Sequence, residues 1–134
     1  MPTKLATMKK LVAALLMTFI FVTAVQAQTK KAEWKEMHDF HGVMGSTFHP
    51  AEEGNLQPIR TRSQEMVDKA VAWQKSDAPE GYSKKAVKTT LKKLVSGAKE
   101  IDGLVKSNAT DKVLTDKLTA LHDVFHEIME KCRK

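Results

Sequence analysis

The spacing of apolar side chains in the second half of the chain is the feature that most constrains its fold. Two stretches place an apolar residue at alternating steps of three and four, over six positions each: Val87, Leu91, Leu94, Ala98, Ile101 and Val105, and then Leu114, Leu118, Leu121, Phe125, Ile128 and Cys132. A helix turns once in about 3.6 residues, so this spacing collects the apolar residues on one side. The pattern predicts two amphipathic helices, with N-caps at Ser83 and at Thr110 or Asp111.

Two further helices are expected in the first half of the chain, over about Lys31 to Phe48 and about Leu56 to Lys75. Their stripes are Trp34, Met37, His41, Met44 and Phe48, and then Ile59, Ser63, Met66, Ala70 and Trp73. Asn55 is the expected N-cap of the second helix, and Pro58 is tolerated there because it lies in the first turn. Pro50 is expected to stop the first helix, because a proline disfavours helical conformation in the residue before it.

The links between the expected helices are short, which limits how the helices can be connected. The second link covers residues 76–82 and the third covers only 107–109. Short links make consecutive helices antiparallel, so we expect an all-α fold, an up-down-up-down antiparallel four-helix bundle. Cys132 is the only cysteine of the chain, so no internal disulfide can stabilise this single domain.

The first 27 residues are expected to be a secretory signal peptide. Lys9 and Lys10 precede the apolar run Leu11 to Val25, and Ala27 ends a Val-Gln-Ala sequence with small residues where a signal peptidase reads them. The run is shorter than the roughly 20 residues that a membrane span needs. We therefore expect a cleaved signal, a periplasmic or secreted domain over 28–134, and no stable membrane anchor. An uncleaved anchor is the alternative.

The charge of the chain argues against nucleic acid as a partner. The formal net charge of +6 falls to +3 when Lys4, Lys9 and Lys10 leave with the signal, and the remaining lysines are interleaved with acids. That pattern is typical of solvated helix faces. The chain also lacks a glycine-rich phosphate loop, an H-E-x-x-H motif, a nucleophile elbow and a C-x-x-C motif, so an enzyme is not expected.

The histidines gather on two of the four expected helices. His38, His41 and His49 lie in or just after the first helix, and His122 and His126 lie in the last. These two helices are neighbours in an up-down bundle, and facing helices of a bundle are a recurrent place for metal sites. His41 occupies a position of the apolar stripe, and the i, i+4 spacing of His122 and His126 lets two imidazoles share one ion.

The sequence therefore predicts a transition-metal site for copper, zinc or iron, with His38, His41, His122 and His126 as ligands. Positions along the two helices place His38 and His122 at similar depths, so we expect them to face one another. His122 and His126 lie about 80° and about 120° from the centre of their apolar stripe, so a solvated histidine pair is the alternative there. For His41 the alternative is a buried imidazole that is hydrogen-bonded to a neighbour.

The sulfur-containing side chains leave further alternatives open. Met37 and Met44 lie on either side of His41, and Met129 follows in the last helix. Such methionines serve either as core side chains or as soft ligands for copper or haem iron. Cys132 is a buried thiol, a metal ligand or, after export, half of an intermolecular disulfide that would make a homodimer.

The segments WKEMHDFHGVM and FHEIMEKCRK resemble the four-helix-bundle cytochromes of the periplasm, the cytochrome c-prime and soluble b-type cytochrome group. In the b-type members a methionine near the start of the first helix and a histidine near the end of the last hold haem iron without a covalent link. Met37 and His126 are the matching positions. The C-x-x-C-H motif of the c-prime members is absent, because only Arg133 and Lys134 follow Cys132. The resemblance thus implies non-covalent haem, and electron transfer with a redox partner protein.

The prediction from the sequence is an exported four-helix bundle that binds a transition metal or haem iron between its first and last helices. An alternative from a different class is a metal-free binding or stress-response module whose helix faces hold another protein. A haem absorption band or bound metal would distinguish the first class from the second.

Overall fold

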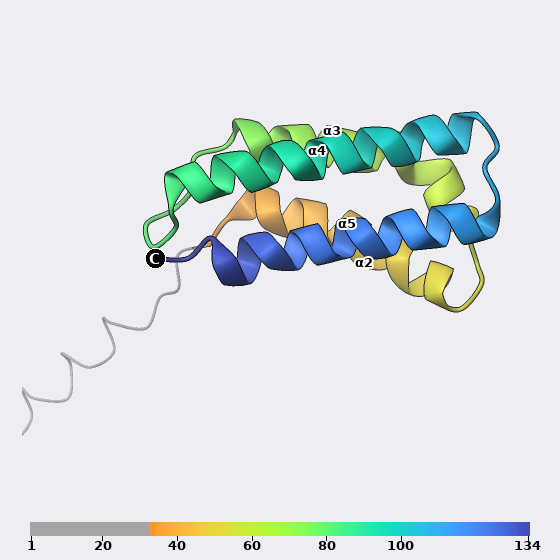
Figure 1. Cartoon of the computed structure of the whole chain (residues 1–134), viewed down its shortest axis with the longest axis horizontal. Coiled ribbons are helices and arrows are strands. Elements are labelled where there is room, and N and C mark those ends of the chain that lie inside the picture. The colour runs from red at the N-terminus through yellow and green to blue at the C-terminus, as the bar shows by residue number, and fades with distance from the viewer. Residues whose placement is uncertain (1–32) are drawn as a thin grey trace, which may run out of the picture. The chain divides into compact units, whose positions relative to one another are not determined.

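The computed structural model describes residues 33–134, which form an all-α, four-helix bundle (Figure 1). The helices are α2 (Lys35–Glu52), α3 (Gln57–Lys75), α4 (Lys84–Lys106) and α5 (Asp111–Lys131). α2 begins after the expected Lys31, because Trp34 is extended at its N-cap. The expected signal peptide over 1–27 lies outside the described residues. Within residues 33–134, no helix combines the length and the apolar character needed to cross a membrane.

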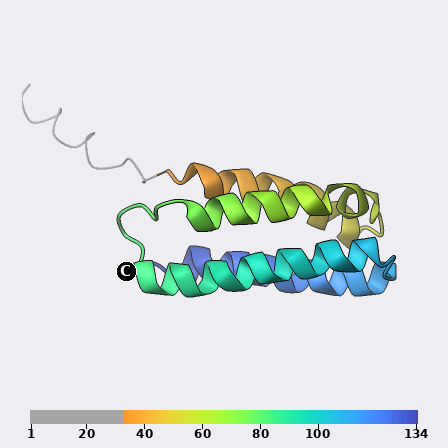
Figure 2. The same cartoon turned by 90° about the horizontal axis from the view of Figure 1, so that it is seen from above.

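The four helices form two layers, with α2 beside α3 and α4 beside α5 (Figure 2). Consecutive helices pack closely on one another, whereas α2 and α5 make the smallest contact of any packed pair. The seam between α2 and α5 is therefore the least tightly closed side of the bundle. It is also the side on which the sequence places the histidines.

The apolar stripes of the last two helices form much of the core, as their spacing predicts. Every stripe position of α4 and α5 is buried except Val105, which is half-buried. The aromatic rings of Trp34, Trp73 and Tyr82 pack together at one end of the bundle. Trp34 lies edge-on to Trp73, with ring centroids 5.6 Å apart, and its indole N–H donates to Ser76 Oγ at 2.8 Å. These contacts fix the start of α2 against the end of α3.

Side-chain caps start the helices close to where the sequence predicts them. Ser83 accepts a hydrogen bond from the backbone N–H of Ala86 at 3.4 Å, and Thr110 accepts one from that of Val113 at 3.3 Å. Asn55 accepts from the first N–H of α3 at 3.1 Å, although the N-cap position itself falls one residue later. Each bond satisfies a backbone donor that the first turn of a helix leaves unpaired.

The expected stop of α2 at Pro50 is wrong, because the helix continues through this proline to Glu52. A proline removes one backbone donor, but its carbonyl group still accepts. The Pro50 carbonyl accepts from the N–H groups of Glu53 at 3.1 Å and Asn55 at 2.8 Å, which closes the last turn. Gly54 then reverses the chain with a φ of 86°, a conformation that favours glycine. The extra turn carries Glu52 on the same helix as the histidines.

Candidate functional site

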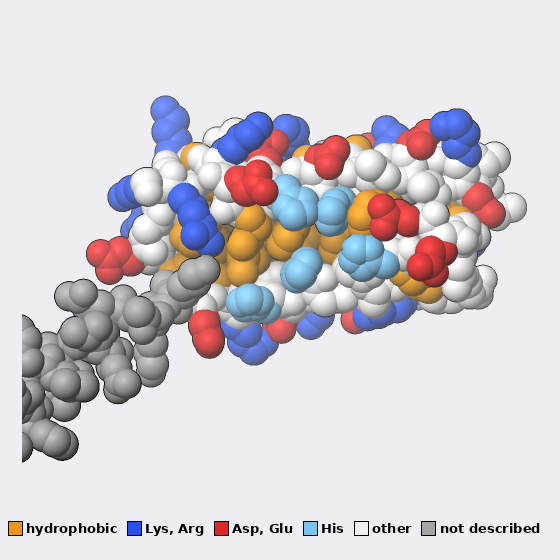
Figure 3. Space-filling view, turned by 90° about the horizontal axis from the view of Figure 1, so that it is seen from below, with side chains coloured by type: hydrophobic (Ala, Val, Ile, Leu, Met, Phe, Trp, Pro, Cys, Tyr) orange, Lys and Arg blue, Asp and Glu red, His pale blue; other side chains and the backbone are white. Residues whose placement is uncertain are grey.

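All five histidines of the chain lie on α2 and α5, the two helices whose seam is the least tightly closed. Figure 3 shows their imidazoles on one face, bordering a strip of hydrophobic side chains. His122 is half-buried and the other four are exposed. We call this surface the histidine face, and its members are His38, His41 and His49 of α2 and His122 and His126 of α5.

The expected place of His41 on the core stripe of α2 is wrong, because its side chain is exposed. The adjacent Phe40, three residues after Met37 and four before Met44, is fully buried instead. A stripe through Phe40 and a stripe through His41 both fit the helical period. Burying the phenyl ring removes more apolar surface from water than burying the imidazole would. The ring of His41 stacks on Phe125 of α5, with centroids 4.9 Å apart and planes at 3°.

A second stacked pair defines the register of α2 against α5. The ring of His122 lies on Phe48, with centroids 4.2 Å apart and planes at 18°. His38 comes ten residues before Phe48, about 15 Å along the helix, so the expectation that it faces His122 is wrong. His38 instead lines a shallow hollow between α2 and α3, together with Arg62 and Glu65.

The four predicted ligands do not form one preassembled cluster. Within the described residues, no three His, Cys, Asp or Glu side chains are placed so that they could hold one metal ion. Of the four, His122 and His126 are in contact, with ring centroids 4.5 Å apart and planes at 79°. The structure therefore brings together the α5 pair and separates it from His38.

The environment of His122 favours its neutral form. Burial lowers the pKa of His122, and the nearby charge of His126 lowers it further. A neutral imidazole has a lone pair on one ring nitrogen, whereas the imidazolium ion has none. His122 therefore presents a nitrogen that can bind a metal ion at neutral pH.

Two glutamates that are not predicted from the sequence as site residues lie against imidazoles of the histidine face. Nδ1 of His49 is 3.2 Å from Glu52 Oε2, and Nδ1 of His126 is 3.7 Å from Glu130 Oε1. Their spacings of i, i+3 and i, i+4 are the sequence signal that could have found both pairs. From the sequence, His49 and Glu53 are only secondary ligand candidates, because they are expected at the far end of the bundle from His126.

The interior between α2 and α5 is filled by aromatic rings. The ring centroids of Phe40 and Trp73 are 5.6 Å apart. The ring centroid of Phe125 lies 6.1 Å from that of Phe40 and 5.8 Å from that of Trp73. Met37 is buried at the edge of this core, whereas His126 is exposed. A haem held between Met37 and His126 would have to displace these rings. The residues present therefore do not fit a haem.

The remaining sulfur-containing side chains belong to the core. Met44 is fully buried, and Met129 is half-buried against the core cluster. Cys132 is a buried free thiol whose Sγ lies 3.6 Å from Thr90 Oγ1. Its burial agrees with the first of its three alternatives, an inert thiol.

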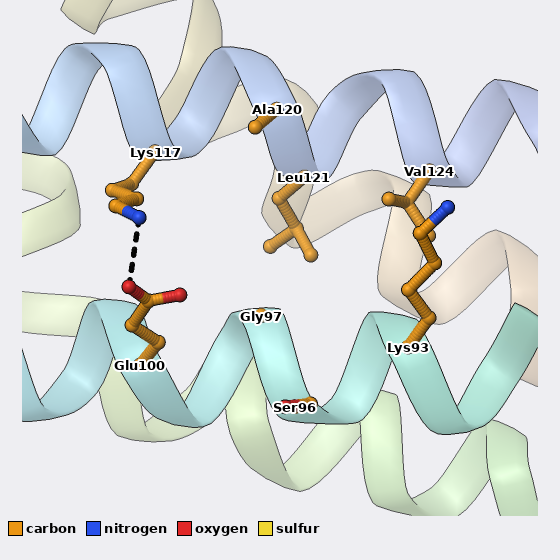
Figure 4. Close-up of a pocket in the computed structure, with 8 residues that line it drawn as sticks. All are labelled: Lys93, Ser96, Gly97, Glu100, Lys117, Ala120, Leu121 and Val124. Carbon is orange, nitrogen blue, oxygen red and sulfur yellow. Dashed lines mark ion pairs between the residues drawn. The ribbon is translucent and has the colours of Figure 1, made fainter.

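A shallow hollow between α4 and α5 is another place where a ligand could be considered (Figure 4). Its two lysines are both ion-paired: Lys117 Nζ lies 2.8 Å from Glu100 Oε1, and Lys93 Nζ lies 3.1 Å from Glu127 Oε2. Because these charges are already neutralised by neighbours, the hollow offers no clear preference for an anion or a cation. We assign it no function.

Comparisons with known proteins give no relative for this chain. No family model matches it, and neither a curated protein nor a solved structure matches it. The chemistry of the histidine face is therefore the basis on which a function is inferred.

Proposed function

We propose that this protein binds a transition metal ion at the histidine face, in the seam between α2 and α5, with His122 and His126 as anchoring ligands. The observation that carries the proposal is the contact between these two rings, whose centroids are 4.5 Å apart on one side of α5. Imidazole nitrogens bind zinc at about 2.0–2.1 Å. Two rings this close can therefore share one ion after rotation about their side-chain bonds.

The ligand chemistry favours zinc or divalent copper. Imidazole suits both ions, whereas monovalent copper prefers thioether and thiolate ligands. Met44 and Cys132 are buried away from the surface, so these two soft ligands are poorly placed for monovalent copper. The N-terminal sequence supports export, so the protein would meet its ion outside the cytoplasm. An electron-transfer role is compatible with copper and not with zinc.

The test is a comparison of metal binding by three forms of the purified protein. Zinc and divalent copper are titrated into the wild type, the double variant H122A/H126A and the control H38A, and bound metal is measured by elemental analysis. We expect the double variant to lose most binding, whereas H38A retains it because His38 lies towards α3. Circular dichroism checks that all three are equally helical.

Unchanged metal content in H122A/H126A would refute the proposal. If the wild type itself binds neither ion, the metal-free interaction module becomes the better interpretation of the same face.

A further inference from the structure

We infer that His49 of α2 is the third ligand of this site, so that one metal ion links α2 to α5 through His49, His122 and His126, and that Glu52 positions His49. The inference rests on the proposed function, because it names a ligand and a positioning residue of the same site. It replaces His38 and His41, the α2 ligands that the sequence predicts.

The register of the seam places His49 at the level of His122. The ring of His122 is stacked on Phe48 at 4.2 Å, and the ring of His49, the next residue, lies 5.6 Å from that of Phe48. His41 lies two helical turns earlier, against Phe125. Phe125 is close to one turn beyond His122 on α5. Of the three α2 histidines, His49 is thus the one beside the residue that His122 contacts.

The ring of His49 lies close to Gly45 of the same helix. A Cβ atom at Gly45 would lie 3.9 Å from His49 Cδ2 and would meet no other neighbour within 4 Å. The ring of His49 therefore folds back along α2 over Gly45. His41, Gly45 and His49 follow at steps of four residues and share one edge of the helix. The stack of His41 on Phe125 shows that this edge borders α5.

The carboxylate of Glu52 determines which ring nitrogen of His49 is free to bind an ion. An ionised carboxylate only accepts hydrogen bonds, so the Nδ1 atom of His49, 3.2 Å from Glu52, carries the proton in the neutral ring. Its Nε2 atom then keeps the lone pair. Glu130 Oε1 lies 3.7 Å from Nδ1 of His126, an ion-pair distance that is too long for a hydrogen bond. A carboxylate on the second nitrogen of a histidine ligand is a common arrangement around protein-bound metals, where it orients the ring.

The side chains are free to complete the site on binding. The side chain of His49 is 69% exposed and that of His126 is 47% exposed, so both rings can turn without leaving a packed core. Because three ligands are not preassembled in the described residues, the ion itself would gather them.

The experiment measures zinc binding to the purified protein in two ways. Zinc affinity is determined by competition with a chromophoric chelator, and the zinc-induced rise in unfolding temperature is recorded in parallel. We expect H49A and E52Q each to lower the affinity about tenfold or more. H49A should also lose most of the rise in unfolding temperature, because an ion held only by α5 no longer links two helices.

Matched controls use the same substitutions at exposed positions of α2 or just after it. H38A and E53Q should bind zinc like the wild type. If H49A also binds like the wild type, or if H41A weakens binding more than H49A does, the inference is overturned. The proposed function survives that result as long as H122A/H126A still abolishes binding. If the wild type binds no zinc and no copper, the inference and the proposed function fail together.

Discussion

The close approach of α4 and α5 at Gly97 leads to a prediction that can be worked from the structure. A Cβ atom at Gly97 would lie 2.9 Å from Leu121 Cδ1, whereas carbon atoms in favourable contact are about 3.5–4.0 Å apart. Figure 4 shows the side chain of Leu121 extending from α5 towards α4 at this level. An alanine gains about 1 kcal/mol in helix propensity, and overpacking costs about 1–3 kcal/mol. We therefore expect G97A to lower the free energy of unfolding by about 0–2 kcal/mol.

Gly103 provides the matched control within the same helix. A Cβ atom there would meet nothing within 4 Å, so G103A should gain helix propensity without a packing cost. Its free energy of unfolding should rise by up to about 1 kcal/mol. Guanidinium unfolding followed by circular dichroism measures both variants. The difference between them, expected to be about 1–3 kcal/mol, isolates the contact with Leu121.

A double-mutant cycle decides whether Leu121 is the cause. Leu121 is 2% exposed, and L121A alone should cost about 2–5 kcal/mol. In that background the neighbour of Gly97 is gone, so adding G97A should stabilise the protein as G103A does. If G97A still lowers the free energy of unfolding in the L121A background, Leu121 is not the cause. Equal stability of the single variants G97A and G103A would also contradict the packing explanation.

Two further predictions concern titratable groups. The carboxylate of Asp102 is buried and accepts hydrogen bonds from Lys106 at 2.6 Å and Ser63 at 2.8 Å. Its pKa is lowered below the ordinary 3.8, and the hydrogen bond from Lys106 is the largest cause. The ionised Asp102 therefore stabilises the fold above pH 3.8, and this stabilisation is lost as the pH falls through the lowered pKa of the folded state. D102N should lower the free energy of unfolding by about 1–2 kcal/mol at neutral pH and should make that free energy depend less on pH in acid. The pKa of His122 is lowered below 6.5 by burial and, to a smaller extent, by His126. As the pH falls, His122 is therefore protonated in the unfolded chain before it is protonated in the folded protein. The free energy of unfolding decreases as the pH falls from 6.5 through the pKa of the folded state. An NMR titration of the metal-free protein should give His122 a midpoint below 6.5, and H122Q should flatten this part of the pH dependence of unfolding; a midpoint at or above 6.5 would contradict the account.

The helices and their order could be predicted from the sequence because the signal is local. Successive apolar residues in α4 and α5 recur at the helical period, and Ser83 and Thr110 cap the helices where their side chains can reach the first free N–H groups. The path of α2 through Pro50 was missed because the closing bonds come from backbone groups after the proline. The general preference against helix before a proline does not take into account these hydrogen bonds from residues that follow the proline.

The candidate site was predicted only in part, because rotation and register are not local properties. The sequence places histidines on the first and last helices of the bundle, but the apolar period fits Phe40 and His41 equally well. Phe40 takes the core position because its ring packs against Trp73 and Phe125, which come from two other helices. With Phe40 in the core, His41 lies at the surface, and the proposed metal site does not include His41.

The sequence by itself determined the four amphipathic helices, their antiparallel order and the helices that carry imidazoles, since each follows from spacing within a segment or from the length of a link. The tertiary structure alone decided which histidines come together. The level of His122 against Phe48, and with it the pairing with His49, depends on how side chains more than seventy residues apart interlock across the α2–α5 seam. Helix periodicity carries no information about that register, because sliding one helix along another leaves both stripes intact.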